Sequence, residues 1–462
     1  MTCGMRDPIS QTGAPATAPP FAAARRMQLR YGFNEIYGCG PFSRGKHREL
    51  IHRRHRLMGT QVVRLFVFDQ PVPDPFKEWH LFADTVQAVL DIGATPMVTF
   101  AKFPPPYDNP RNIRNFVARC SEVLWGCIEQ WGGETVKDWY WCIWNEPNNP
   151  IVGGDLTFDE YRRIYEAVAA EIVKQLDPYL GGRKPKIGGP AIDGTHRPYW
   201  LDWIARLVNE VDNRVVSFVS WHRYGDWRPA VPSASLNLEM WDSPDAPEGK
   251  ALEALLMAQT PQYEARALSV AQVLHGRDIL NVCGELNTIS HHENYYTLGL
   301  NQNMFGAAYY ASALIGLLRG GADLEMRWTA TSYDEQTDAY GLMTMNGDPT
   351  PACLAKQLFA QHVRYGDWIR FPRRHSETPE VDAVVAGDDN GRRSGVFVNM
   401  GSRPHQMTVA DWDKELSACS EVLRLDSSTG DRVVREAFDG TVRINGYGIA
   451  VVTDATNETQ VD

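Results

Sequence analysis

Residues 139–147 combine the pattern of a buried strand with a carboxylic acid at its end. Trp139-Tyr140-Trp141-Cys142-Ile143 is a run of aromatic and branched residues, and it continues into Trp144-Asn145-Glu146-Pro147. The run predicts a short strand that is buried along its length. Proline ends such a strand because it has no N–H to donate to a neighbour. In a parallel barrel the carboxyl ends of the strands form the active face, so we expect Glu146 to lie there.

A second glutamate has the same setting. Ile279-Leu280-Asn281-Val282-Cys283-Gly284 is another short apolar run, and Glu285 follows it directly. Two carboxyl groups at strand ends are typical of glycoside hydrolysis, in which one carboxylic acid protonates the leaving oxygen and one carboxylate attacks the anomeric carbon. We expect Glu146 to be the acid/base and Glu285 the nucleophile. The alternative is that each glutamate is a solvated loop residue or a salt-bridge partner.

The chain between residues 27 and 368 alternates short apolar runs with longer amphipathic stretches, which is the rhythm of repeated β/α units. Strands are predicted at 28–34, 60–68, 95–101, 139–145, 185–190, 215–222, 279–285 and 323–329. Helices are predicted at 44–58, 76–92, 110–131, 157–176, 197–211, 249–275 and 300–320, with Gly320-Gly321 ending the last one. The fold class is therefore α/β, a (β/α)8 TIM barrel, in which both glutamates lie on one rim although 139 residues separate them.

The two ends of the chain differ from this rhythm. Residues 369–462 contain short strands near 381–386, 395–400 and 448–452 that are separated by Gly, Asp, Asn and Arg, a pattern that predicts a C-terminal antiparallel β-sandwich. Residues 1–26 are rich in Pro, Ala, Thr and Gly and lack the apolar core of a signal peptide, so we expect a flexible leader and a cytoplasmic protein. We expect no membrane partner, because no run approaches the length of a membrane span.

Charge and cysteine usage exclude other classes of function. The 462 residues carry a formal charge of −11, which argues against nucleic acid as a partner. The eight cysteines are scattered without a CxxC pair, so a metal knuckle is not expected. The histidines in His52-Arg53-Arg54-His55 and His291-His292-Glu293 lack HExxH spacing, and we interpret both clusters as surface features rather than metal ligands. No phosphate loop or dinucleotide fingerprint is present, so no cofactor is expected.

Polar residues near the other predicted strand ends are candidates for the same site. Arg64 lies inside the apolar run Val62–Val67; a charge there needs a buried anionic partner, and Glu285 is the candidate. His222 and Tyr224 end the strand at 215–222, where they are placed to orient the nucleophile and the sugar. The alternative for this pair is a satisfied core histidine and a packing tyrosine.

Three further residues are candidates for contact with the sugar. Asn145 precedes the acid and is placed to donate its amide to the sugar 2-hydroxyl. Trp328, near the end of the strand at 323–329, is placed to form a floor under the reacting sugar, with core packing as the rival interpretation. The loop after Glu285 offers His292 as a substrate contact.

These motifs resemble glycoside hydrolase family 39, within the clan A retaining glycosidases, a family of β-xylosidases and exopolysaccharide hydrolases. The resemblance is carried by Trp144-Asn145-Glu146-Pro147-Asn148, Lys186-Ile187-Gly188-Gly189-Pro190-Ala191, Val216-Ser217-Phe218-Val219-Ser220 with His222 and Tyr224, and Tyr340-Gly341-Leu342-Met343 followed by Pro349-Thr350-Pro351-Ala352. It extends over roughly residues 60 to 365. It implies net retention of anomeric configuration, no metal, and a barrel with an attached β-sandwich.

The segment Cys283-Gly284-Glu285-Leu286-Asn287 departs from the family, whose xylosidases carry Thr before the glutamate and an aromatic residue after it. Tyr31-Gly32-Phe33-Asn34-Glu35 lacks the family's His-Val-Gly pattern. The expected substrate is a β-xyloside, an arabinoside or a related oligosaccharide or polysaccharide. An endo-acting exopolysaccharide hydrolase and a non-catalytic carbohydrate-binding barrel remain as alternatives. The sequence leaves the sugar, its linkage and the oligomeric state open.

Overall fold

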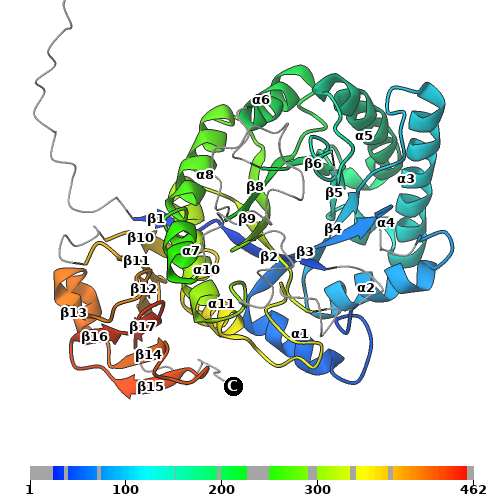
Figure 1. Ribbon diagram of the computed structural model, residues 1–462. Helices are drawn as coiled ribbons and strands as arrows, with labels where there is room; N and C mark the ends of the chain where they lie inside the picture. Colours follow the sequence, from blue (N-terminus) through cyan, green and yellow to red (C-terminus); the bar gives the residue numbers. More distant parts are fainter. Residues whose placement is uncertain are drawn as a thin grey trace, which may run out of the picture.

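Eight parallel strands close into a barrel, and helices form a ring around it (Figure 1). The computed structural model describes residues 24–35, 40–69, 74–150, 152–194, 199–225, 249–289, 299–332, 340–372 and 378–454. The barrel strands follow one another in chain order: β2 (Arg30–Glu35), β3 (Thr60–Val67), β4 (Thr95–Phe100), β5 (Tyr140–Ile143), β6 (Lys186–Ile192), β7 (Phe218–Tyr224), β8 (Leu280–Asn287) and β9 (Leu324–Trp328). The predicted TIM barrel is confirmed.

The helices cover the outer face of the barrel, and their buried apolar sides form the largest core of the protein. Their bounds are α1 (Arg48–Leu57), α2 (Trp79–Asp91), α3 (Pro110–Trp131), α4 (Gly133–Val136), α5 (Phe158–Leu180), α6 (Trp200–Glu210), α7 (Gly249–Met257), α8 (Pro261–Val273), α10 (Met304–Gly320) and α11 (Pro351–His362). Local signals set several of these ends. Thr157 and Glu160 form a reciprocal capping box at the start of α5, and Gly321 adopts the left-handed conformation that ends α10.

One helix prediction is wrong. A single helix was expected over 249–275, but the chain forms α7 and α8 with a break between them. Pro261 is the first residue of α8. Proline is favoured at that position because its missing N–H is not needed there, whereas in a helix interior it removes a hydrogen bond and clashes with the preceding turn.

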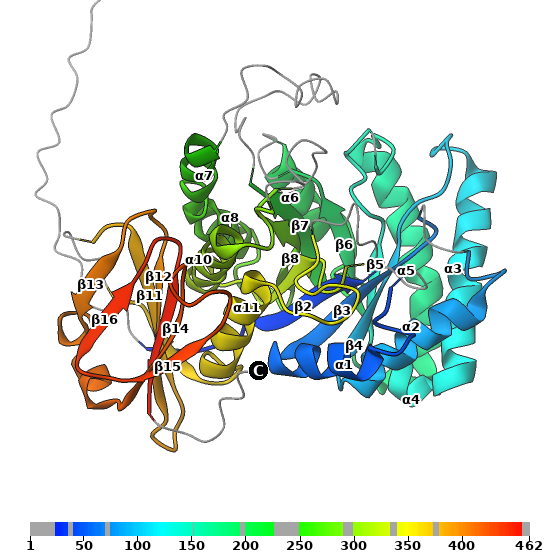
Figure 2. The same ribbon diagram turned by 60° about the horizontal axis from the view of Figure 1, so that its bottom comes forward.

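The C-terminal part of the chain forms two antiparallel sheets beside the barrel (Figure 2). The larger sheet has the order β1-β10-β11-β12-β17-β14-β15, and β13 pairs with β16 in the smaller one. The bounds are β1 (Arg25–Arg26), β10 (Trp368–Arg370), β11 (Val381–Gly387), β12 (Arg393–Asn399), β13 (His405–Thr408), β14 (Glu421–Leu425), β15 (Val434–Ala437), β16 (Thr441–Ile444) and β17 (Ile449–Thr453), with short 3-10 turns η3 (Val409–Asp411) and η4 (Lys414–Ala418). Side chains of both sheets share one apolar core. The expected antiparallel second domain is confirmed.

The larger sheet includes two residues from the other end of the chain. Arg25 and Arg26, which the sequence pattern assigns to the leader, form β1 and pair with Ile369 and Trp368 of β10. Thus the edge of the C-terminal sheet is completed by the segment that precedes the barrel.

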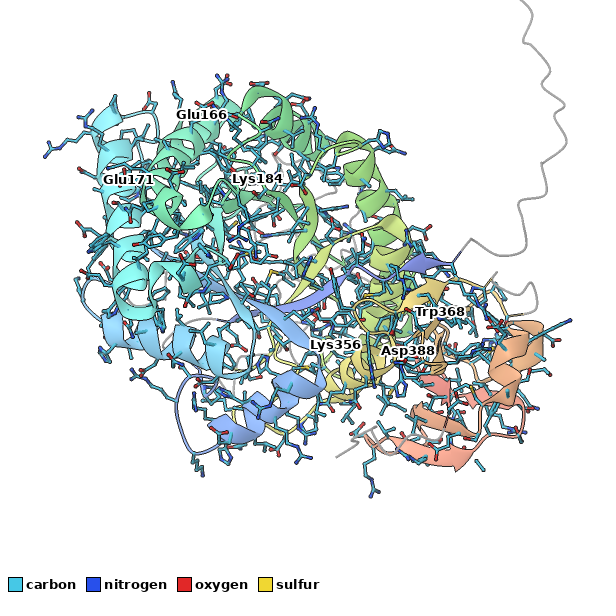
Figure 3. All side chains as sticks on the ribbon, turned by 180° about the vertical axis from the view of Figure 1, so that it is seen from behind. Glu166, Glu171, Lys184, Lys356, Trp368 and Asp388 are labelled. Carbon is cyan, nitrogen blue, oxygen red and sulfur yellow. The ribbon has the colours of Figure 1, made fainter. Side chains whose placement is uncertain are left out.

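Helices α10 and α11 lie between the barrel and the larger sheet (Figure 2). Because α10 has neighbours on both sides, almost its whole circumference is buried. Arg319 of α10 pairs with Asp382 of β11 at 2.5 Å, which ties the helix to the sheet. Lys356 of α11 is fully buried and pairs with Glu325 of β9 at 2.5 Å; in Figure 3 it lies near the junction of the two parts.

The surface interpretation of one histidine pair is wrong. His52 and His55 are both buried, and His55 packs edge-to-face on Phe33 of β2 with ring centroids 5.5 Å apart. Helical spacing places residues three apart on the same face of α1, and that face is turned to the barrel. His291 and His292 lie outside the described residues.

The six cysteines that lie in the described residues are free and buried. Within the described part of the chain, no helix is both long enough and apolar enough to cross a membrane.

Candidate active site

The backbone after β5 carries Glu146 to the carboxyl end of the barrel. Trp144 N and Asn145 N donate to Phe100 O and Ala101 O on one side, whereas Glu146 N donates to Ala191 O on the other side, at 2.9 Å. The chain changes side with positive φ values at Trp144 and Glu146, 77° and 49°. Such a conformation costs a non-glycine residue about 1–3 kcal/mol and is found where the surrounding structure holds it. Here the three backbone hydrogen bonds hold it.

Glu285 reaches the same place from β8. His222 of β7 is its register partner, and a bulge between Trp221 and His222 shifts the pairing just before this point. Oxygen atoms of Glu146 and Glu285 and a ring nitrogen of His222 all lie within 4.8 Å of one another. All three residues are buried. The expected meeting of two glutamates that are far apart in sequence is therefore present.

His222 lies between the two carboxyl groups. Its Nδ1 is 2.8 Å from Glu146 Oε1 and 3.6 Å from Glu285 Oε2. Burial lowers the pKa of His222 to about 3, and the nearby Arg64 lowers it as well, although Glu285 acts in the opposite direction. The imidazole is therefore neutral, and its contact with Glu146 is a hydrogen bond rather than an ion pair. The sequence pointed to the nucleophile as its partner, but the shorter contact is to the acid/base candidate.

Both carboxylate oxygens of Glu285 accept a hydrogen bond from a fixed donor. Arg64 Nη1 lies 2.7 Å from Oε1, and Tyr224 Oη donates to Oε2 at 2.7 Å. Burial is the largest influence on the pKa of Glu285 and raises it; Glu146 raises it further, whereas Arg64 and Tyr224 lower it. The arginine and the tyrosine thus favour the charged form that a nucleophile needs.

Arg64 is fully buried and connects several elements of the site. Besides Glu285 it donates to Asn34 Oδ1 at 3.2 Å, to Thr99 Oγ1 at 2.9 Å and to Asn145 Oδ1 at 2.8 Å. The last contact fixes the orientation of the Asn145 amide, because Arg64 uses its oxygen and no hydrogen bond within the described residues uses its nitrogen. Asn34 was not singled out from the sequence. Its position could have indicated a place in the site, because Asn34 is the next-to-last residue of the first barrel strand and is polar within an apolar run.

Asn149 also contacts the acid/base candidate. Its Nδ2 donates to Glu146 Oε2 at 2.9 Å and to Asp193 Oδ2 at 3.3 Å. Asn149 N also donates to Glu146 O at 2.9 Å, so the residues after the glutamate turn back over it. Asn148 joins the same turn to the backbone of Asp193: its Nδ2 donates to Asp193 O, and its Oδ1 accepts from Asp193 N. Sequence reasoning missed Asn149 and Asp193, although Asn149 directly follows the quoted motif.

Trp328 ends β9 on the same face of the barrel. Its ring lies edge-to-face on Phe66, with centroids 5.5 Å apart and an interplanar angle of 81°. Unlike its neighbours in β9, Trp328 is only partly buried. His292 lies outside the described residues.

The cluster of Glu146, His222 and Glu285 has a spacing at which side chains can also hold a metal ion. The donor environment fits a proton-transfer site better. A guanidinium 2.7 Å from Glu285 already neutralises that carboxylate and repels a dication. The hydrogen bonds of Arg64 and Tyr224 use a lone pair on each of its oxygens.

Comparisons with known proteins agree with the motifs. A family model described as glycosyl hydrolases family 39 matches residues 90–262, which include Glu146 and His222. A beta-xylosidase from Geobacillus stearothermophilus is 38% identical over 170 residues, 34% of this chain and 32% of that relative. A beta-xylosidase from Caldicellulosiruptor saccharolyticus is 21% identical over 326 residues, 66% of this chain and 60% of that relative. The matches thus span about a third and three-fifths of the lengths of these relatives.

Solved structures share the architecture over nearly the whole chain. A family 39 beta-xylosidase from Caulobacter crescentus has a TM-score of 0.61 at 15% identity and covers 95% of this chain and 98% of its own. A family 51 alpha-L-arabinofuranosidase from Bifidobacterium longum has a TM-score of 0.63 at 14% identity and covers 93% of this chain and 97% of its own. At such identities the likeness shows the fold. Together with the family model and the beta-xylosidase relatives, it confirms the resemblance to glycoside hydrolase family 39.

Proposed function

We propose, from the relationship to family 39, that this chain is an O-glycosyl hydrolase that acts with retention of configuration, with Glu146 as acid/base and Glu285 as nucleophile. The observation that supports this most directly is the approach of the two carboxyl groups to within 4.8 Å. Retaining enzymes place these groups about 5–5.5 Å apart, whereas inverting enzymes need about 6.5–9.5 Å to admit a water molecule between carboxylate and sugar. A separation within 4.8 Å between one oxygen of each carboxyl group supports the retaining spacing over the inverting one.

The proposed reaction has two balanced steps. In the first, a Glu285 oxygen bonds to the anomeric carbon, the glycosidic C–O bond breaks, and the leaving oxygen takes the proton of Glu146. In the second, the Glu146 carboxylate takes a proton from water, the water oxygen bonds to the anomeric carbon, and the ester bond to Glu285 breaks. His222 contributes a neutral ring between the carboxyl groups, so it adds no charge that would fix Glu146 as a carboxylate.

The surrounding residues have proposed roles in holding the sugar. Asn145 donates its amide to the sugar 2-hydroxyl, in the orientation that Arg64 fixes. Trp328, which is only partly buried, forms the floor under the reacting sugar. The relatives described as beta-xylosidases and the alpha-L-arabinofuranosidase fold neighbour favour a pentoside, a β-xyloside or an arabinoside, as substrate.

Hydrolysis of nitrophenyl glycosides tests the proposal. The wild type and the variants Glu146→Gln and Glu285→Gln are each assayed with xylosides, arabinosides, glucosides and galactosides. Thermal unfolding checks that each variant is folded. We expect hydrolysis of a pentoside by the wild type and, by NMR, a first product with the configuration of the substrate. Tight sugar binding without turnover would instead identify a non-catalytic binding barrel, and near-normal turnover by both variants would contradict the assignment.

A further inference from the structure

Two arginines lie on either side of the strand that carries the nucleophile candidate. Arg223 of β7 and Arg327 of β9 are both register partners of Leu286, which directly follows Glu285 in β8. Successive side chains of a strand point to opposite faces. Since Glu285 faces the barrel interior, the row Arg223-Leu286-Arg327 faces outward, toward α8 and α10.

Contacts of both guanidinium groups confirm this direction. Arg223 Nη2 donates to Gln259 Oε1 at 2.7 Å, just before α8. Arg327 Nη2 donates to Asn301 O at 2.5 Å, just before α10, and its guanidinium lies 4.4 Å from the ring centroid of Tyr310. The exposed fractions of Arg223 and Arg327 are 2% and 0%. Two permanently charged groups are therefore enclosed between the barrel and its helices.

Neither arginine forms an ion pair in the described part of the chain. Three of their nitrogens, Arg223 Nε and Arg327 Nε and Nη1, are buried without a hydrogen-bond partner among the described residues. The carboxylate nearest in sequence on the same face of β9 is Glu325, and its oxygens are used by Lys356 at 2.5 Å and by Tyr310 at 3.2–3.3 Å. A buried charge without a counter-ion is costly, and so is a buried donor without an acceptor.

Two hydroxyl groups lie in the same layer. Thr288 is two residues beyond Leu286, directly after the end of β8, and its buried Oγ1 has no hydrogen-bond partner among the described residues. Tyr309 Oη of α10 lies 3.4 Å from Tyr263 Oη, and Tyr263 Oη itself donates to Arg223 O at 2.9 Å. Unused donors of β7, of β9 and of Thr288 just after β8 thus lie on one outer patch of the barrel, with a tyrosine hydroxyl beside them.

We propose that this patch, formed by Arg223, Leu286, Thr288, Tyr309 and Arg327, binds a small monovalent inorganic anion, with chloride as the abundant candidate. Two strand spacings of about 4.8 Å place the two arginine backbones about 10 Å apart, one on each side of Leu286. Both guanidinium charges also lower the pKa of the Tyr309 hydroxyl against the effect of burial, which places that hydroxyl near both arginines. A polyvalent oxyanion fits less well, because the nitrogens are almost free of solvent contact and a larger charge is more costly to remove from water. The ion would fasten β7 and β9 to both sides of the strand that carries Glu285.

Halide replacement tests the site without reference to catalysis. Crystals of the full-length chain, prepared without chloride and soaked in sodium bromide, should show an anomalous bromide peak in contact with Arg223 and Arg327. Bromide peaks only at the protein surface, with water or a protein side chain on the arginine nitrogens, would overturn the proposal.

A solution measurement separates specific binding from binding at crystal concentrations. In sodium chloride, compared with sodium gluconate at the same ionic strength, the Tm of the wild type should rise by a few degrees and then saturate, as ligand linkage requires. Arg327→Gln should lose this response, whereas Arg206→Gln, which removes an arginine that is paired at the surface, should keep it.

A wild-type Tm that does not depend on the anion would contradict the proposal, even if Arg327→Gln fails to fold. Glu285→Gln should keep the response while losing hydrolysis, so failure of this inference and failure of the proposed function are distinguishable.

Discussion

Arg64 and Glu285 form a buried ion pair at the carboxyl end of the barrel, with Arg64 Nη1 2.7 Å from Glu285 Oε1. Arg64 is one of the groups that lower the pKa of Glu285 against the effect of burial. The same guanidinium holds Asn34, Thr99 and Asn145. It therefore has two effects, because it favours the charged form of the nucleophile candidate and fixes the Asn145 amide that we propose to contact the sugar.

Arg64→Lys should keep the positive charge but lose the planar fork that makes four contacts. We expect kcat/KM to fall by roughly 100-fold, since disrupting a buried pair costs about 3 kcal/mol or more. The acid limb of the pH profile of kcat/KM should also move to higher pH, because the pKa of Glu285 rises when a donor is lost. Arg206→Lys at the surface is the matched control. A lower rate with an unmoved acid limb would assign Arg64 a purely structural role.

The roles of the two glutamates can be separated with azide. In Glu285→Gly the small anion occupies the vacated space and attacks an activated nitrophenyl glycoside directly, so the expected product is a glycosyl azide of inverted configuration. In Glu146→Gly the glycosyl-enzyme still forms, and azide then displaces Glu285 to give a product of retained configuration. NMR of the two azides distinguishes them. Exchanged configurations would reverse the assignment, and two inverted products would contradict double displacement.

Asn149 should act as a positioning residue for Glu146. Its Nδ2 is 2.9 Å from Glu146 Oε2, so Asn149→Ala removes one of the hydrogen bonds that hold this carboxyl group. Protonation matters most for poor leaving groups. We therefore expect kcat/KM to fall about 10-fold for alkyl or sugar leaving groups and to change little for dinitrophenyl glycosides. Equal losses for both classes of leaving group would show that Asn149 supports the fold or sugar binding instead.

The sequence was sufficient to predict the barrel and the two glutamates because both depend on local patterns. A parallel strand is buried on both faces, so Tyr140–Ile143 and Leu280–Gly284 read as continuous apolar runs, and a polar residue at the end of such a run stands out. The pairing of Arg64 with Glu285 followed from the cost of one charge within an apolar strand.

The contacts that could not be predicted depend on turns and on distant partners. Asn149 reaches Glu146 only because the backbone turns back after the motif, with Asn149 N donating to Glu146 O. Arg25 and Arg26 have no strand signal of their own and become β1 because Ile369 and Trp368 offer them an edge. No local pattern in the sequence records either relationship.

Glu35 gives the pH dependence of stability a clear sign. Burial raises its pKa from 4.5 to about 8, although hydrogen bonds from Thr331 lower it, and His55, 3.6 Å away, has a pKa lowered to about 3 by burial and does not neutralise it. The folded state therefore binds a proton that the unfolded state has released between about pH 4.5 and pH 8. Over this window the free energy of unfolding should fall as pH rises, by up to about 1.4 kcal/mol per pH unit from this group.

Glu35→Gln should remove that slope, so the stability of this variant relative to the wild type should increase from pH 5 to pH 8 in urea unfolding. The control Glu166→Gln, on the exposed face of α5 (Figure 3), should leave the slope unchanged. Parallel pH dependence of Glu35→Gln and the wild type would contradict the raised pKa of Glu35.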